Sequence, residues 1–324
     1  TRDKLGLDSY KNIGFIPVEK ESESVSKTLE YAYDDWTIAQ MANSMGEQED
    51  YKTFMERSQN YINVFDPTTK FMRGRFRNTW FAPFDPYEVN FNYTEANSWQ
   101  YSFYVPHDIT GFMNLLGGKD QLEKQLDNLF IADDKTSGRE QADITGLIGQ
   151  YAHGNEPSHH MAYLYNFVNK PYKTQEKTRQ ILTELYTNSP DGISGNEDCG
   201  QMSAWYIFSS LGFYPVTPGS NQYIIGSPLF DKATIHLEDG NSFTVEAKNN
   251  SLENKYIKNV QLNNKAYPYS YLKHSAIVNG GNLVFEMTDS PTNWGTSDDF
   301  IPSTEIKDHK IIPAPFIKKG DIVF

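Results

Sequence analysis

The chain has 324 residues, of which 38% are hydrophobic and 22% charged, a composition typical of a folded globular protein and not of a disordered one. The net charge of -13 and the lack of a basic stripe argue against nucleic acid as a partner, because a polyanion is bound by clustered Lys and Arg. No apolar run approaches the roughly 18 residues that a membrane-spanning helix needs. With Cys199 as its single cysteine, the chain cannot form an internal disulfide.

Apolar residues recur every three or four positions through the first two thirds of the chain, which is the spacing of one helical face. The row formed by Val25, Leu29, Ala32, Trp36 and Ala39 predicts a first helix. Further helices are predicted over 51–65, over 109–116 with a stop at Gly117-Gly118, and over 122–129, 159–168, 174–186 and 201–211. The connections between them are long and rich in Gly, Pro, Asn and Asp.

After about Gly212 the pattern changes to β-branched and aromatic runs that are separated by turn residues. Strands are predicted within 220–236, 242–247, 256–262 and 283–287, with turns at Asp239-Gly240 and Gly280-Gly281. The sequence therefore predicts a mainly α fold with a β-rich C-terminal unit, divided into a helical domain over 1–215 and a β-rich unit over 216–324. Paired helices of this kind suit a toroid of α-hairpins as well as a bundle.

Three connections combine carboxylates, amides and aromatic side chains and lead into predicted helices. They cover residues 92–101, 149–160 and 192–205, and we call them the first, second and third loops. Each also contains a residue type that caps helices, such as Asn97, Ser158 or Asp198, so each has a purely structural interpretation. In a helical toroid such loops would gather at one mouth, where side chains from separate loops could converge.

Carboxylates in the first and third loops suit glycoside cleavage, which needs one protonated carboxyl as acid and one carboxylate acting from the opposite face. Glu95 suits the acid, because the aromatic residues around it, including Trp99, are expected to raise its pKa. Asp198 and Glu197 suit the base, since adjacent carboxylates beside Asn196 can hold a water and a cation.

The second and third loops also offer metal ligands. Calcium prefers hard oxygen ligands, which are supplied by Asn155, Glu156, Asn196, Glu197 and Asp198. A histidine cluster in the second loop suggests zinc instead, and it consists of His153, His159 and His160. The histidine spacing is not that of a helical ligand pair, and Pro157 interrupts the segment, so the sequence favours calcium.

Aromatic residues make up 14% of the chain, which suits either a large core or platforms for sugar rings. Asp34 and Asp35 precede Trp36 on the first predicted helix. They are candidate acceptors for sugar hydroxyls, and the alternative is a solvated helix edge.

Long, ordered stretches of the sequence resemble glycoside hydrolase family 92, exo-acting α-mannosidases of bacterial glycan-degrading systems. The matching stretches are residues 24–36, 93–101 with 105–108, 148–160, and 195–205 with 212–215. The resemblance covers nearly the whole chain. It implies an N-terminal β-sandwich followed by an (α/α)6 toroid, with calcium binding the mannose hydroxyls.

By motif position, the resemblance implies that Glu95 is the general acid and Asp198 the general base. Position 196 would assist the base, and Asn196 stands where family members can carry Asp. Glu156 and His153 would lie near the leaving-group sugar. The substrate contacts would then comprise Asp34, Asp35, Trp99, His153, Glu156 and Glu197, and the calcium ligands would comprise Asn155, Asn196 and Asp198.

The implied activity is release of α-1,2-linked mannose from the non-reducing end of glycans, with inversion at the anomeric carbon. The implied location is secreted, periplasmic or on the surface of a bacterial cell. The sandwich and the early toroid helices have no counterpart in the sequence, so an N-terminal portion is an expected partner. Two other functions remain open, a non-catalytic glycan-binding protein on the same scaffold and a metal-dependent phosphodiester hydrolase built on the histidines.

Overall fold

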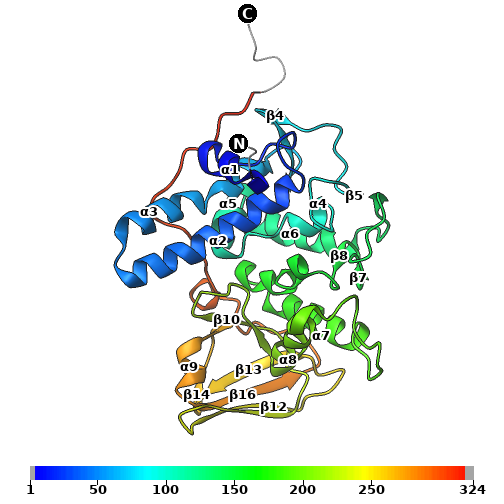
Figure 1. The fold of residues 1–324 in the computed structure, drawn as a ribbon. Coiled ribbons are helices and arrows are strands. Elements are labelled where there is room, and N and C mark those ends of the chain that lie inside the picture. The colour runs from blue at the N-terminus through cyan, green and yellow to red at the C-terminus, as the bar shows by residue number, and fades with distance from the viewer. Residues whose placement is uncertain (1–3, 318–324) are drawn as a thin grey trace, which may run out of the picture. The chain divides into compact units, whose positions relative to one another are not determined.

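The computed structural model describes residues 4–317, which divide into two compact units. The first unit comprises the described residues up to Gln121, together with Asn128–Ala152 and the residues from Thr304 onward. The second unit comprises Leu122–Asp127 and His153–Ser303. Figure 1 follows the chain from its blue N-terminal helices to its red C-terminal segment.

Helices dominate the first unit. They are η1 (Lys4–Gly6), α1 (Leu7–Ile13), α2 (Ser24–Met45), α3 (Gln48–Arg57), η2 (Asn60–Val64), α4 (Ser98–Tyr101), η3 (Pro106–Asp108), α5 (Ile109–Leu116) and the ends of α6 (Lys119–Ile131). Three predicted helices are confirmed as α2, α5 and α6. The predicted helix over 51–65 is confirmed only in part, because α3 ends at Arg57 and the chain continues as a short 3-10 turn.

Short strand pairs hold the long connections of the first unit, and the sequence analysis missed them because two residues carry no periodicity. The antiparallel pairs are β1 (Phe65–Asp66) with β2 (Phe71–Met72), β3 (Arg75–Phe76) with β4 (Thr79–Trp80), and β7 (Leu147–Ile148) with β8 (Tyr151–Ala152). The parallel pair is β5 (Glu88–Val89) with β6 (Ser137–Gly138).

Asp108, which is buried, ties the C-terminal segment to α5. Its carboxylate accepts hydrogen bonds from the Tyr61 hydroxyl at 2.8 Å, the Gly111 N–H at 3.1 Å and the Ile306 N–H at 3.1 Å. A Cβ at Gly111 would collide with the Asp108 carboxylate, so this close approach requires glycine. The segment from Thr304 onward therefore belongs to the first unit through specific polar contacts.

The second unit begins with helices and continues as sheet. Its helices are η4 (Glu156–Ser158), η5 (Met161–Val168), α7 (Pro171–Glu184), η6 (Asp198–Gly200), α8 (Gln201–Leu211), α9 (His274–Val278) and η7 (Asp298–Phe300). The predicted helices over 174–186 and 201–211 are confirmed as α7 and α8. The predicted helix over 159–168 is a 3-10 helix, η5, that is buried along its whole length.

Two sheets form the rest of the second unit. Its strands are β9 (Phe213–Tyr214), β10 (Gln222–Ile225), β11 (Lys232–His236), β12 (Ser242–Lys248), β13 (Tyr256–Leu262), β14 (Lys265–Ala266), β15 (Tyr271–Lys273) and β16 (Gly281–Thr288). The larger sheet has the order β11-β12-β16-β13-β14, with β12 and β16 parallel, and the smaller has the order β15-β10-β9. The predicted strand region 220–236 is thus two strands that belong to different sheets.

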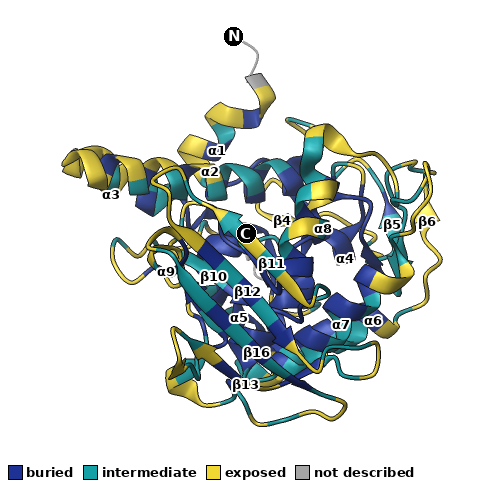
Figure 2. Cartoon of the chain, turned by 90° about the horizontal axis from the view of Figure 1, so that it is seen from below, coloured by how far each residue is buried: buried dark blue, intermediate teal, exposed yellow. Residues whose placement is uncertain are grey.

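Alternation of buried and exposed residues fixes which face of the larger sheet forms the core. Phe243 and Val245 in β12, and Leu283 and Phe285 in β16, point to the buried side, while the residues between them are more exposed. Figure 2 shows this as alternating blue and paler bands along the strands. Helices followed by a β-rich C-terminal part are therefore present, although the compact units divide the chain at points other than residue 215. The predicted (α/α)6 toroid stays a prediction.

Candidate functional site

The second and third loops meet at the buried imidazole of His159 in the second unit. Its Nε2 lies 2.9 Å from the carbonyl oxygen of His153, and its Nδ1 lies 3.0 Å from the side-chain nitrogen of Gln201. The indole N–H of Trp205 donates to the His159 carbonyl at 2.9 Å. The second and third loops are therefore in contact, whereas the predicted convergence of all three loops at a toroid mouth stays a prediction.

These contacts fix the protonation of His159. A carbonyl can only accept, so Nε2 carries the proton, and Nδ1 accepts from the amide of Gln201. Burial lowers the pKa of His159 to about 4, so the ring is neutral at pH 7. Burial also lowers the pKa of His153, and the neighbouring His159 lowers it further.

An aromatic wall lies against His153. Its ring centroid is 4.4 Å from that of Trp205, and its Nε2 is 2.7 Å from the hydroxyl of Tyr186. The Tyr186 ring stacks on Trp205 with an interplanar angle of 2°. The sequence analysis missed Tyr186 and Gln201, because each looked like an ordinary terminal residue of a predicted helix.

The third loop carries Asp198 on an unusual backbone. Asp198 and Cys199 both adopt left-handed conformations, with φ of 52° and 54°, and Gly200 follows with φ of 104°. Non-glycine residues pay about 1–3 kcal/mol for such a conformation, which clusters at functional sites. Asp198 is exposed.

Glu197 has a structural role beside Asp198. Its carboxylate accepts from the backbone N–H of Gly200 and, at 3.2 Å, from that of Ser203, and so caps η6, the short helix that leads into α8. Hydrogen bonding from Ser203 lowers the pKa of Glu197. The capping carboxylate is thus Glu197 rather than Asp198, while the substrate contact predicted for Glu197 stays a prediction.

The predicted calcium ligands all belong to the second unit. Asn155 is buried and precedes η4, whereas Asn196 and Asp198 are exposed. Glu156 opens η4 and is also exposed. Among residues 4–317, no group of three or more His, Cys, Asp or Glu residues is placed to hold a metal ion. Amide and carboxylate oxygens are a donor set that suits calcium.

Glu95, the predicted acid, lies in the first unit and also has a left-handed backbone, with φ of 52°. The residues after it are held firmly, because Asn97 and Gln100 form a capping box at α4 and the Asn97 amide donates to Gln150 at 2.8 Å. Glu95 itself is exposed.

The aromatic residues beside Glu95 in sequence do not enclose it. Tyr93 donates its hydroxyl hydrogen to the Met72 carbonyl at 2.8 Å, and Trp99 packs edge-on against Phe71 with ring centroids 4.6 Å apart. Trp99 is buried, and its indole nitrogen has no hydrogen-bond partner among the described residues. These neighbours do not enclose Glu95 within the described residues, and its role as the acid stays a prediction.

The two aspartates of α2 differ sharply in environment. Asp35 is buried and accepts from the Arg57 Nε and from the Tyr10 hydroxyl, each at 2.9 Å. Asp34 is exposed, and partial desolvation followed by the charge of Asp35 raises its pKa. Asp35 therefore has a structural ion pair, and the sugar contacts predicted for both residues stay predictions.

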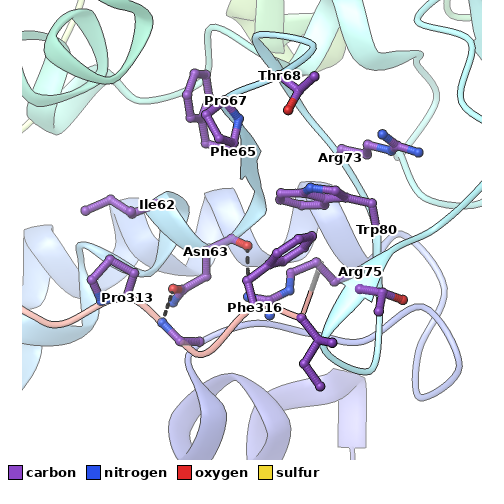
Figure 3. Close-up of a pocket in the computed structure, with 13 residues that line it drawn as sticks. Ile62, Asn63, Phe65, Pro67, Thr68, Arg73, Arg75, Trp80, Pro313 and Phe316 are labelled. Atoms are coloured by element: carbon purple, nitrogen blue, oxygen red, sulfur yellow. Dashed lines mark hydrogen bonds between the residues drawn. The ribbon is translucent and has the colours of Figure 1, made fainter. Parts of the chain in front are cut away.

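Each of the two units contains a cavity. One of about 880 Å³ lies in the first unit, and its walls include Phe65, Arg75, Trp80 and Phe316 (Figure 3). None of the predicted site residues lines it. Another of about 540 Å³ lies in the second unit, where Tyr186 and Tyr206 line it together with Gly192 and Ile193 of the third loop.

Comparison with known proteins identifies the family of this chain. The model of the glycosyl hydrolase family 92 catalytic domain matches residues 1–289. This chain belongs to glycosyl hydrolase family 92. Among the described residues no helix is long and apolar enough to cross a membrane.

Family 92 structures resemble the chain closely. A family 92 α-mannosidase from Bacteroides thetaiotaomicron, solved with mannoimidazole, is 43% identical with a TM-score of 0.88, over 93% of this chain and 41% of that one. An inverting family 92 mannosidase from the same species is 37% identical with a TM-score of 0.85, over 94% and 43%. An uncharacterized secreted glycosidase of Arthroderma benhamiae is 28% identical, over 92% and 41%. The chain thus spans about two fifths of the length of these relatives.

The buried histidine of this family 92 chain predicts a pH-dependent stability. Since burial depresses the pKa of folded His159 to about 4, its stabilising contribution is complete above the unfolded pKa near 6.5 and is lost as pH falls toward 4. His159→Gln keeps a donor and an acceptor but does not titrate. Urea unfolding at pH 7 and pH 4.5 should therefore show a smaller pH dependence for His159→Gln, by up to about 3 kcal/mol.

An equal pH dependence in wild type and His159→Gln would contradict a neutral, hydrogen-bonded His159.

Proposed function

We propose that this chain is the C-terminal catalytic portion of an α-mannosidase that releases terminal α-linked mannose with inversion. The observation that carries the proposal is the family match over residues 1–289 together with solved relatives that are named α-mannosidases and, in one case, an inverting mannosidase. The three predicted loops all lie within the matched region. The α-1,2 linkage preference belongs to the proposal as well.

Glu95 is proposed as the general acid and Asp198 as the general base. In an inverting reaction the acid protonates the leaving oxygen while the base removes a proton from the attacking water. Both residues stand on left-handed backbones beside capped helices, which supports the proposal because strain at a fixed position is typical of functional residues. Asn196 next to the base is proposed to orient the water.

The predicted substrate contacts are part of the proposal as well. His153 and Glu156 would face the leaving-group sugar, and the neutral state of His153 lets its ring accept or donate hydrogen bonds without adding charge. Asp34, Asp35 and Trp99 are proposed in the first unit, and Glu197 in the second. A glycan-binding protein without catalysis would need only these contacts. The proposed carboxylate pair of Glu95 and Asp198 therefore favours an enzyme over a binding protein.

Calcium is the proposed cofactor, held by Asn155, Asn196 and Asp198. When bound, the ion would bind sugar hydroxyls and favour a distorted ring. The chain's own contribution is an oxygen-only donor set, with Asn155 buried in the fold. The hydrogen bonds at both ring nitrogens of His159 count against zinc, because those nitrogens are already engaged.

The activity is proposed for a longer enzyme. Besides this chain, that enzyme would contain a part that corresponds to the rest of the relatives' length. An N-terminal β-sandwich and the first part of an (α/α)6 toroid are the proposed missing partners. Glu95, Glu156 and Asp198 are all exposed in the described residues, whereas a general acid works best in a poorly solvated site. A secreted or cell-surface location is proposed, since one relative is named a secreted glycosidase.

The acid role predicts a substrate-dependent loss in Glu95→Gln. In the longer enzyme, turnover of a mannobiose should fall roughly 10²-fold or more, because the amide cannot donate the proton. The loss should shrink with a leaving group that departs without protonation. Glu238→Gln, at an exposed position of the β11–β12 turn, is the control and should retain full activity. Equal losses on both substrates would remove Glu95 from the acid role.

Inversion predicts β-mannose as the first product. NMR of the anomeric proton, recorded before mutarotation, identifies the product directly. Early α-mannose would overturn the inverting mechanism while leaving mannosidase activity itself intact.

The cofactor proposal predicts loss of activity in EGTA and recovery with calcium, since oxygen ligands favour hard cations. Turnover of the same mannobiose, measured after dialysis and with each metal in turn, tests it. Recovery with zinc alone would revive the histidine cluster as the metal site.

A further inference from the structure

The cavity of about 540 Å³ in the second unit is formed by α7, α8 and the chain that connects them (Figure 1), and we call it the α7–α8 cavity. Its volume lies within the roughly 300–1,000 Å³ that is usual for small-ligand sites. None of the described residues that line it is charged, although charged residues make up 22% of the chain. The cavity therefore offers a ligand only neutral groups.

Aromatic rings and neutral polar side chains make up much of this lining. The rings of Tyr186 and Tyr206 lie with their centroids 4.9 Å apart. Beside them stand the hydroxyl and amide groups of Thr187, Asn188 and Ser189, all at exposed positions. Among the described residues, the hydroxyl of Tyr206 and the side-chain amide of Asn188 have no hydrogen-bond partner, so both are available to a ligand.

The α7–α8 cavity is held in shape before any ligand enters. The Tyr186 hydroxyl lies 2.7 Å from Nε2 of His153 and donates to the Met202 carbonyl at 3.2 Å, so the Tyr186 ring is fixed. Another part of the rim is a closed turn, in which the Thr187 N–H donates to the Gly192 carbonyl at 2.9 Å. A Cβ at Gly192 would collide with the Thr187 carbonyl oxygen, so the turn requires glycine. A preformed site loses little conformational entropy on binding.

Two contacts join the α7–α8 cavity to the candidate catalytic site. Ser203, which lines the cavity, donates its backbone N–H to the Glu197 carboxylate at 3.2 Å, and Glu197 directly precedes the proposed base, Asp198. Tyr186 contacts His153, which is proposed to face the leaving-group sugar. A ligand in the cavity would thus lie beside groups that the proposed reaction uses, within the same compact unit.

We propose that the α7–α8 cavity is an accessory subsite for a neutral sugar unit of the glycan substrate, other than the two units joined by the bond that is cleaved. The inference rests on the proposed function, since that function supplies the glycan. A pyranose ring would pack its apolar face on Tyr206, and its hydroxyl groups would bond to the Tyr206 hydroxyl and the Asn188 amide.

The neutral lining favours a sugar over other ligand classes. A charged ligand would need a countercharge, and the described lining offers none. A purely apolar ligand would leave the amide and hydroxyl groups of the rim without partners. A ring that is apolar on its faces and carries hydroxyl groups on its edge matches both kinds of surface. The cavity therefore predicts that longer glycans are bound more tightly than a disaccharide.

Titration calorimetry with α-1,2-linked mannobiose and mannotetraose tests the proposal in the longer enzyme, with Glu95→Gln present so that neither ligand is cleaved. Tyr206→Ala should raise the Kd of mannotetraose at least about fivefold, because the stacked ring is lost. The Kd of mannobiose should change less than about twofold, since its two units occupy only the positions on either side of the bond to be cleaved. Leu252→Ala, at a 71% exposed position of the second unit outside the cavity, is the control and should leave both values unchanged.

Asn188→Ala is a second variant, at an exposed residue whose side chain bonds to none of the described residues. Loss of one hydrogen bond should raise the Kd of mannotetraose about twofold to tenfold and leave that of mannobiose unchanged. Unchanged affinity for mannotetraose in folded Tyr206→Ala or in Asn188→Ala, or equal losses for the two ligands, would overturn the proposal. Since binding is measured without turnover, a Tyr206-dependent affinity for mannotetraose in an enzyme inactive on mannosides would overturn only the proposed function.

Discussion

The burial of long polar loops is the constraint on which the rest of this structure depends. The first loop brings the amides of Asn97 and Gln100 into the interior, and the second brings the imidazoles of His153 and His159. A buried polar group left unpaired costs about 1–3 kcal/mol. The chain avoids this cost by hydrogen-bonding buried polar groups, and His159 is the central example. Its Nδ1 and its carbonyl join the second loop to α8, and its Nε2 donates to the His153 carbonyl within the loop. Burial keeps the ring neutral, so that no charge has to be solvated.

Hydrogen bonds also hold the groups next to the two candidate carboxylates in place. The groups next to them are locked, by the Asn97–Gln100 capping box in one unit and by the Glu197 cap in the other. Glu95 and Asp198 themselves stand on left-handed backbones at the exposed ends of these locked segments. Rigid support for an exposed reactive group is what a catalytic site requires, because misplacement by about 1 Å is costly.

Exposure links the candidate site to the proposed incompleteness of the chain. A general acid and a mannose-binding site both need walls that exclude solvent.

The sequence by itself determined the helices with strong periodicity, the strand-forming pattern after Gly212 and the loops that contain the candidate residues. Local spacing and residue chemistry suffice for these features. Only the tertiary structure decided which neighbours each side chain meets. Trp99 packs against Phe71, and the Tyr93 hydroxyl donates to the Met72 carbonyl. Asp35 pairs with Arg57, Glu197 caps a short helix, and Gln201 donates to His159. Burial and hydrogen-bond partners depend on contacts between residues far apart in the chain, and no local pattern carries that information.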